Sequence, residues 1–175
     1  MGVGSEVVAP DSRTSAGGLT TRLRSSRGAR VPESRFGLQP SRMSDDTRSE
    51  AVTDGIRVVV QSQYLPQHSQ PTAGRFAFAY RVRIENVGHP GIVQLRTRHW
   101  VITNQLGKVE EVRGPGVVGE HPVLRPGDAF EYSSGAILET PRGTMHGSYQ
   151  MQLPNGEELD VRIAPFALAV PHSLN

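Results

Sequence analysis

Alternation of apolar and polar residues marks several stretches of the chain as β-strands. The clearest stretch spans residues 75–85, where apolar side chains occupy every second position between mainly charged ones. Successive side chains of a strand point to opposite faces, so this stretch predicts one core face and one solvent face. A helix would spread the same residues around its circumference. The apolar positions are Phe76, Phe78, Tyr80, Val82 and Ile84.

Similar period-two patterns recur along the chain, with turn signals about every eight to twelve residues. They predict further strands over residues 56–61, 92–103, 108–112, 129–134, 145–153 and 159–163. Residues 165–168 are expected to form an edge segment, because Pro165 cannot donate to a ladder. About seven or eight short strands without a helical pattern predict an all-β fold, an antiparallel β-sandwich; a closed barrel has the same periodicity.

The first 43 residues differ from the rest, being rich in Ser, Gly, Arg and Pro without sustained periodicity. Such a segment cannot bury enough apolar area to offset the conformational entropy lost on ordering. We therefore expect residues 1–43 to be a disordered tail and residues 50–175 to be the folded domain. Two other interpretations fit this segment: an organelle transit peptide, or an over-extended start with Met43 as the true first residue.

The net charge of +2 is unevenly distributed. Residues 1–43 hold seven arginines against Glu6, Asp11 and Glu33, so the remainder is slightly acidic and nucleic-acid binding is not expected. The lack of cysteine excludes disulfides, thiolate metal ligands and thiol nucleophiles. No apolar run approaches the roughly 18 residues that span a bilayer. We expect a cytoplasmic protein without membrane insertion.

A glycine-rich stretch between the two halves contains a G-x-G-x-x-G string at Gly114, Gly116 and Gly119. A dinucleotide-binding fingerprint requires a helix to begin at these glycines, so that the helix N-terminus can hold a pyrophosphate. Pro122 and Pro126 follow at once, and no helical apolar stripe intervenes. The string therefore predicts a loop between strands.

Such a loop could still bind an anion. Backbone amides without neighbouring side chains can form a nest, and Arg113 beside them could clamp a phosphate. Arg96 and Arg98 are expected on one face of the preceding strand and could join the site. The hypothesis is a phosphate or pyrophosphate site, whereas the structural alternative is that the glycines supply positive φ at turns and bulges. Its residues would be Arg113, Gly114, Gly116, Gly119, Arg96 and Arg98.

Metal and catalytic chemistry find little support. The histidines lie at positions 68, 89, 99, 121, 146 and 172, without a ligand spacing, so we predict no metal site and no cofactor. No G-x-S-x-G elbow places a nucleophilic serine. The adjacent acids at 110–111 and 157–158 would point to opposite faces of a strand and cannot share a site. The chain is therefore expected not to be an enzyme.

Trp100 is the single tryptophan. A tryptophan on a strand usually packs in the core, but an exposed one would be the natural anchor for a protein partner. A rigid sandwich with loops at its ends is a common platform for partners. An interaction module that uses Trp100 or an edge strand is thus the alternative to anion binding.

Several blocks of the sequence resemble the ApaG domain family, over about residues 54–175. The resemblance implies a fibronectin type III-like or immunoglobulin-like sandwich, and bacterial members are tied to cobalt resistance and magnesium efflux. Related eukaryotic domains act as interaction modules. His121 and Pro115 depart from the expected pattern. The matching blocks are residues 64–66, 80–86, 98–102, 112–119, 126–135, 143–149 and 163–166.

Overall fold

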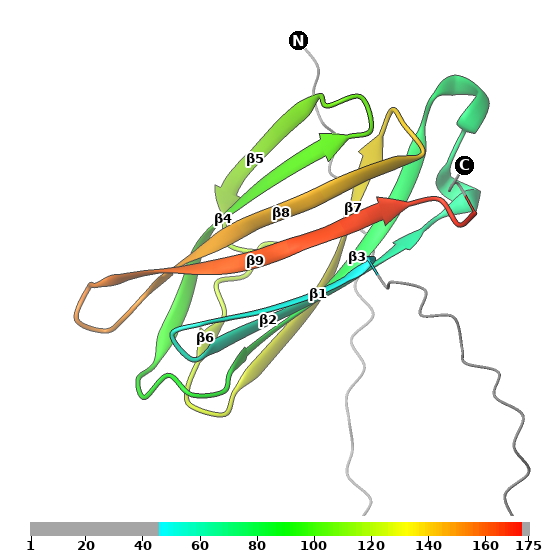
Figure 1. Ribbon diagram of the computed structural model, residues 1–175. Coiled ribbons are helices and arrows are strands. Elements are labelled where there is room, and N and C mark those ends of the chain that lie inside the picture. Colours follow the sequence, from blue (N-terminus) through cyan, green and yellow to red (C-terminus); the bar gives the residue numbers. More distant parts are fainter. Residues whose placement is uncertain (1–45, 173–175) are drawn as a thin grey trace, which may run out of the picture. The chain divides into compact units, whose positions relative to one another are not determined.

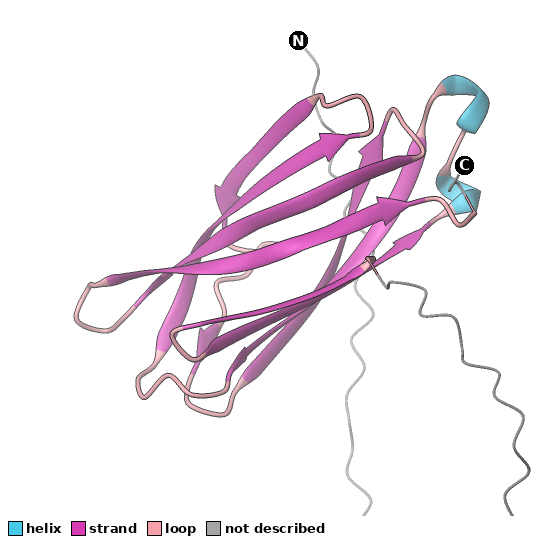
Figure 2. Cartoon of the chain, in the orientation of Figure 1, coloured by secondary structure: helices cyan, strands magenta, loops and turns pink. Residues whose placement is uncertain are grey.

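The computed structural model describes residues 46–172, and the expected tail at 1–43 lies outside them. Two single-turn 3-10 helices, η1 (Pro66–His68) and η2 (Pro71–Ala73), link the second and third strands (Figure 2). The rest of the described chain is strands and their connections. The strands are β1 (Arg48–Thr53), β2 (Ile56–Tyr64), β3 (Phe76–Asn86), β4 (Val93–Asn104), β5 (Val109–Pro115), β6 (Val123–Leu124), β7 (Ala129–Leu138), β8 (Arg142–Gln152) and β9 (Glu158–Ala169).

The strands form two antiparallel sheets that pack face to face (Figure 1). The first sheet has the order β1-β2-β3-β7. The second has the order β5-β4-β8-β9, and β6 pairs with the start of β4. The predicted antiparallel sandwich of the fibronectin type III and immunoglobulin type is therefore confirmed, and the barrel alternative is not what forms.

The strand pattern predicted most elements but missed β1 and the two-residue β6, and it shortened β7. β1 has only weak alternation, and it is held by tertiary contacts: Ser49 Oγ donates to the Ala164 carbonyl at 2.8 Å, and the Arg162 amide donates to Thr53 Oγ1 at 3.1 Å. β7 continues past the predicted end at Ser134 because β3 offers it a pairing partner as far as Leu138. The alternation of apolar and polar residues along the chain reveals neither these tertiary contacts nor the extended pairing.

Pro165 lies within β9, at the edge of the second sheet, as expected. The ladder between β8 and β9 shifts register between Met145 and Gly147, which leaves the residues around Pro165 outside the regular pairing. A bulge of this kind accommodates a residue that has no amide hydrogen.

Trp100 stands at the centre of the core and is 2% exposed. Its ring lies 5.4 Å from that of Tyr80 in the first sheet, and 6.2 and 6.0 Å from those of Tyr149 and Phe166 in its own sheet. Edge-to-face arrangements at these distances are favourable beyond the area that they bury. The indole is therefore not available as a surface anchor, which corrects the hypothesis that Trp100 binds a partner.

Gly147 makes room for this packing. It pairs with Trp100 across β4 and β8, and a Cβ atom at this position would lie 2.0 Å from the His99 carbonyl oxygen. Atoms cannot approach so closely, so any side chain at residue 147 would push β8 away from β4. The glycine is required by the close approach of two strand backbones.

Gly147→Ala should therefore lower the free energy of unfolding by roughly 1–3 kcal/mol, as overpacking of a core does. Urea denaturation followed by tryptophan fluorescence measures the change. Gly88→Ala is the matched control, because its nearest non-neighbouring atom would be 3.7 Å from the new Cβ. Equal stability of the two variants would contradict this account.

Tyr132 and Tyr149 join the two sheets through a hydrogen bond between their hydroxyl groups. Tyr149 is fully buried and Tyr132 is 7% exposed. Burial raises the pKa of both hydroxyls well above the ordinary value, because a phenolate would lose its hydration. Both tyrosines therefore stay protonated in the folded protein at pH values where the unfolded chain ionises.

The free energy of unfolding should accordingly fall as the pH rises above about 10, where unfolded tyrosine releases its proton and the folded protein retains it. Urea denaturation at about pH 9 and pH 11 tests this. The double variant Tyr132→Phe, Tyr149→Phe should lose much of this dependence. Ionisation of all four tyrosines near pH 10 with the fold intact, seen by ultraviolet absorbance, would contradict the expectation.

Candidate functional site

The predicted glycine loop is partly strand. β5 continues through Pro115, and Gly114 pairs with Arg98 on β4. Only residues after Pro115 form the connection, which reverses direction in a tight turn between Val117 and Glu120. The G-x-G-x-x-G string therefore spans a strand end and a turn, with no helix after it.

Three backbone amides around this turn are used within the protein. The Gly116 amide donates to the Arg96 carbonyl at 2.8 Å. The Val117 amide donates to the Glu120 carbonyl at 2.9 Å, and the Glu120 amide returns a bond to Val117 at 2.8 Å. These three amides cannot also donate to an anion, so the Gly116 amide is not available to the predicted amide nest in this conformation.

Arg98 holds the loop from the side of β4. Its Nη1 donates to the carbonyl oxygens of Pro115 and Gly116, at 3.0 Å each. Its guanidinium covers Gly114, where a Cβ atom would lie 3.0 Å from Nη1. Gly114 thus provides space for the arginine, and the arginine donates hydrogen bonds to the carbonyls of the last residue of β5 and the residue after it.

Arg96 does not share a face with Arg98, which corrects the expected pairing of the two arginines. The ladder between β4 and β8 shifts register between Leu95 and Thr97, which is a β-bulge at Arg96. One extra residue changes which face the following side chains occupy. Arg98 alternates with buried Trp100, whereas Arg96 Nη1 donates to Gln94 Oε1 at 3.3 Å on the outer face.

Arg113 lies on the outer face of β5 and bonds to a carboxylate. It pairs across the strands with His99, and its guanidinium donates to Glu111 at 3.3 Å. His99 Nε2 lies 2.9 Å from the same Glu111 oxygen. Hydrogen bonds from His99 and then Arg113 lower the pKa of Glu111. Of the three arginines predicted to share one site, Arg98 therefore lies on the inner face, whereas Arg96 and Arg113 lie on the outer face and bond to Gln94 and Glu111.

The tip of the loop holds an unusual backbone conformation. Val118 has φ of 43° and Gly119 has φ of 80°. Positive φ at both central residues defines a type I′ turn, which favours Asn-Gly. A β-branched side chain at positive φ costs about 1–2 kcal/mol, so Val118 is strained here, and it is 37% exposed.

Val118→Asn should therefore raise the free energy of unfolding by about 1 kcal/mol, since asparagine tolerates this conformation. Thermal and urea denaturation measure the gain. Val87→Asn is the control, because Val87 is also an exposed valine but is not among the residues with positive φ. The absence of any difference between the two substitutions would show that the turn carries no strain.

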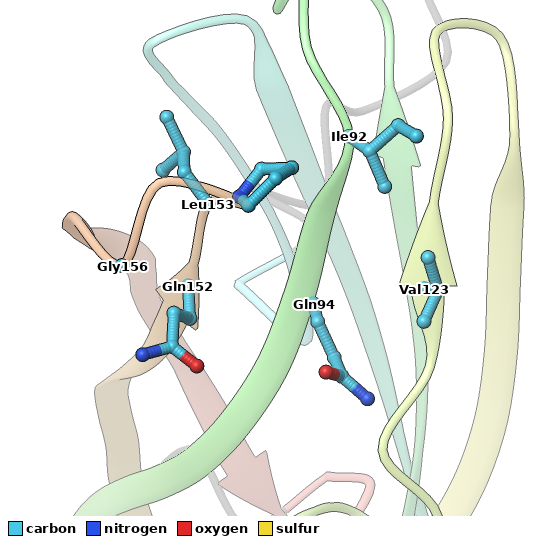
Figure 3. A pocket seen from close by; sticks show the side chains of 7 residues that line it. Ile92, Gln94, Val123, Gln152, Leu153 and Gly156 are labelled. Atoms are coloured by element: carbon cyan, nitrogen blue, oxygen red, sulfur yellow. The ribbon is translucent and has the colours of Figure 1, made fainter.

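A shallow hollow of about 330 Å³ lies beside the bulge, on the second sheet (Figure 3). Gln94 and Gln152 are direct cross-strand neighbours on β4 and β8, and Val123 pairs with Gln94 from β6. Ile92 and Val123 are 38% and 46% exposed. The hollow thus combines apolar walls with two carboxamides. Its lining residues are Ile92, Gln94, Val123, Gln152, Leu153, Pro154 and Gly156.

Sequence reasoning missed this hollow because its residues come from three separate segments. Neighbouring contacts set the position of Gln94: its Nε2 donates to the His121 carbonyl at 3.3 Å, and the His121 Nδ1 lies 3.2 Å from the Leu95 carbonyl oxygen. His121 and the bulge together fix the connection that brings β6 against β4. Only the tertiary pairing brings these residues together.

Neither a cluster of metal ligands nor a membrane-spanning helix is found among the described residues. Over 46–172, no group of three or more His, Asp or Glu side chains is placed to hold a metal ion. No helix in the same range is long and apolar enough to cross a membrane.

The fold is a two-sheet β-sandwich. Comparison of the sequence with known proteins shows the family. The model of the ApaG domain matches residues 66–153. The curated ApaG protein of Rhodospirillum centenum is 60% identical over 121 residues, covering 69% of this chain and 92% of that protein. The ApaG protein of Thiobacillus denitrificans is 53% identical over 120 residues, covering 69% and 94%. This chain belongs to the ApaG family.

A solved structure shows the same fold. The crystal structure of an ApaA protein from Bordetella pertussis has 47% sequence identity and a TM-score of 0.65, and the match covers 67% of this chain and 95% of that one. The predicted resemblance to the ApaG family is thereby confirmed.

Proposed function

We propose that this member of the ApaG family is a non-catalytic binding module that receives an extended segment of a partner protein in the hollow beside β6. The observation that carries the proposal is the exposure of Ile92 and Val123 beside two aligned glutamines. The predicted absence of enzymatic activity is part of this proposal.

The chemistry of the hollow suits a peptide. Ile92, Val123 and Leu153 offer apolar contact for a partner's side chains. The carboxamides of Gln94 and Gln152 can each donate to and accept from a peptide backbone. A peptide bound in extended form satisfies its own amides through such groups while its alternate side chains enter apolar depressions.

The resemblance supplies the cellular setting of the proposal. Bacterial relatives are tied to cobalt resistance and magnesium efflux, and we place this chain in the same cytoplasmic physiology of divalent cations. In the proposal the link to cations runs through a bound partner. The described residues offer no preformed cluster of ligands that would bind the ion directly.

Arg96 supports a second candidate, a phosphate-type anion. Its guanidinium donates to Gln94, a neutral amide that lines the hollow. A phosphate or pyrophosphate at this edge of the hollow would give the guanidinium a charged acceptor in place of the amide. This site replaces the loop amides of the sequence-based hypothesis.

Peptides selected from a random library against the full chain should bind in the hollow. Ile92→Ser and Val123→Ser should each weaken a selected peptide by about tenfold or more, because truncating an apolar anchor removes much of its binding energy. Isothermal titration calorimetry measures the affinities. Leu106→Ser is the control, because Leu106 is 84% exposed and does not line the hollow.

Affinities that these substitutions leave unchanged would overturn the peptide-binding proposal. A parallel titration with pyrophosphate separates the second candidate. Binding that Arg96→Gln abolishes and Arg81→Gln preserves would favour the anion; Arg81 is a comparable exposed arginine on the first sheet.

A further inference from the structure

β5 is an edge strand that lies almost entirely at the surface. It pairs with β4 on one side, and no strand among residues 46–172 pairs with its other side. Its burial pattern contains no fully buried residue. An edge of this kind presents unpaired backbone donors and acceptors that another strand can use.

The pairing with β4 decides which backbone groups point outward. The Gly116 amide donates to the Arg96 carbonyl, and the Lys108 carbonyl accepts from the Asn104 amide, so the even-numbered residues between them face β4. Backbone groups alternate along an antiparallel ladder. The amides and carbonyls of Val109, Glu111 and Arg113 therefore point away from the sheet.

The sequence of β5 is complementary to itself when read in the opposite direction. The strand has seven residues, from Val109 to Pro115, and Val112 is its midpoint. An antiparallel pairing of two copies about Val112 places Glu111 of each copy opposite Arg113 of the other. The backbone amides and carbonyls of both residues point away from β4, so these residues form the hydrogen-bonded pairs of the new ladder. The two pairs give about four backbone hydrogen bonds in all.

The side chains fit this register on both faces. Glu111 and Arg113 lie on the outer face, where opposite charges on directly paired residues attract. Val112 meets Val112 of the second copy on the inner face. Glu110 lies opposite Gly114 of the second copy. The guanidinium of Arg98 covers that glycine, at the place where a side chain would otherwise lie. Each acidic side chain of the strand thereby faces a basic group.

We propose that β5 joins two copies of this chain into a symmetric dimer with one continuous sheet. Charged edges usually discourage pairing with other strands. Here the order of charges favours pairing with a second copy of β5, because Glu111 then meets Arg113. A strand with an acid opposite Glu111 or a base opposite Arg113 would be repelled. A twofold axis through Val112 makes each contact occur twice, as closed symmetry requires.

Sedimentation velocity of the full chain from about 10 μM to about 1 mM should show a monomer–dimer equilibrium. Glu111→Arg or Arg113→Glu should each weaken the dimer by about tenfold or more, because each places like charges opposite one another at two equivalent points. The double variant Glu111→Arg, Arg113→Glu should regain the dimer, since it exchanges the charges and preserves complementarity. Glu158→Arg on β9, at the opposite edge of the sheet, is the control and should leave it intact.

Hydrogen exchange locates the interface independently of the variants. The outward amides of Glu111 and Arg113 should exchange quickly in dilute solution and slowly at high concentration, whereas those of Glu110 and Val112 should be protected in both. A monomer at every concentration would overturn the proposal. So would a dimer that both single variants leave unchanged, a double variant that fails to regain it, or concentration-dependent protection confined to other strands.

Discussion

The packing of Trp100 against rings from both sheets is the contact on which the sandwich depends. Tyr80 reaches it from the first sheet, while Tyr149 and Phe166 reach it from the second. This packing requires β4 and β8 to approach closely at Gly147, where no side chain fits. Because these two strands carry β5, β6 and β9 on their flanks, the position of every outer element of the second sheet follows from this one contact.

The bulge at Arg96 divides β4 into two parts whose arginines point to opposite faces of the sheet. On one side, Arg98 is turned toward the core face and donates to the carbonyls of Pro115 and Gly116 at the end of β5. On the other side, Gln94 and Arg96 lie on the outer face beside the hollow. A regular strand would place both arginines on one face. The extra residue therefore separates a structural arginine from one that is positioned for binding.

The two sheets differ in what their outer faces offer. On the first sheet, Arg57 bonds to Glu85 at 2.6 Å, and hydrogen bonds from Arg57 and then Arg83 lower the pKa of that glutamate. Hydrogen bonds from Arg81 and then from Arg83, which lies 3.0 Å away, lower the pKa of Glu131. Exposed pairs of this kind contribute little to stability, but they satisfy one another's charges. The second sheet carries the hollow and the exposed edge of β5. Both proposed contacts of the protein therefore lie on one sheet.

The sequence by itself determined the all-β class and most strands, because alternation and turn residues are local properties, and blocks of it resemble the family to which the chain belongs. It also showed that the glycine string does not begin a helix. Only the tertiary structure decided that Trp100 is buried, that three of the loop amides are already paired, and that Gln94 and Gln152 become neighbours. The physical reason is that these outcomes depend on register between distant strands, and a bulge of one residue changes the face that each later side chain occupies.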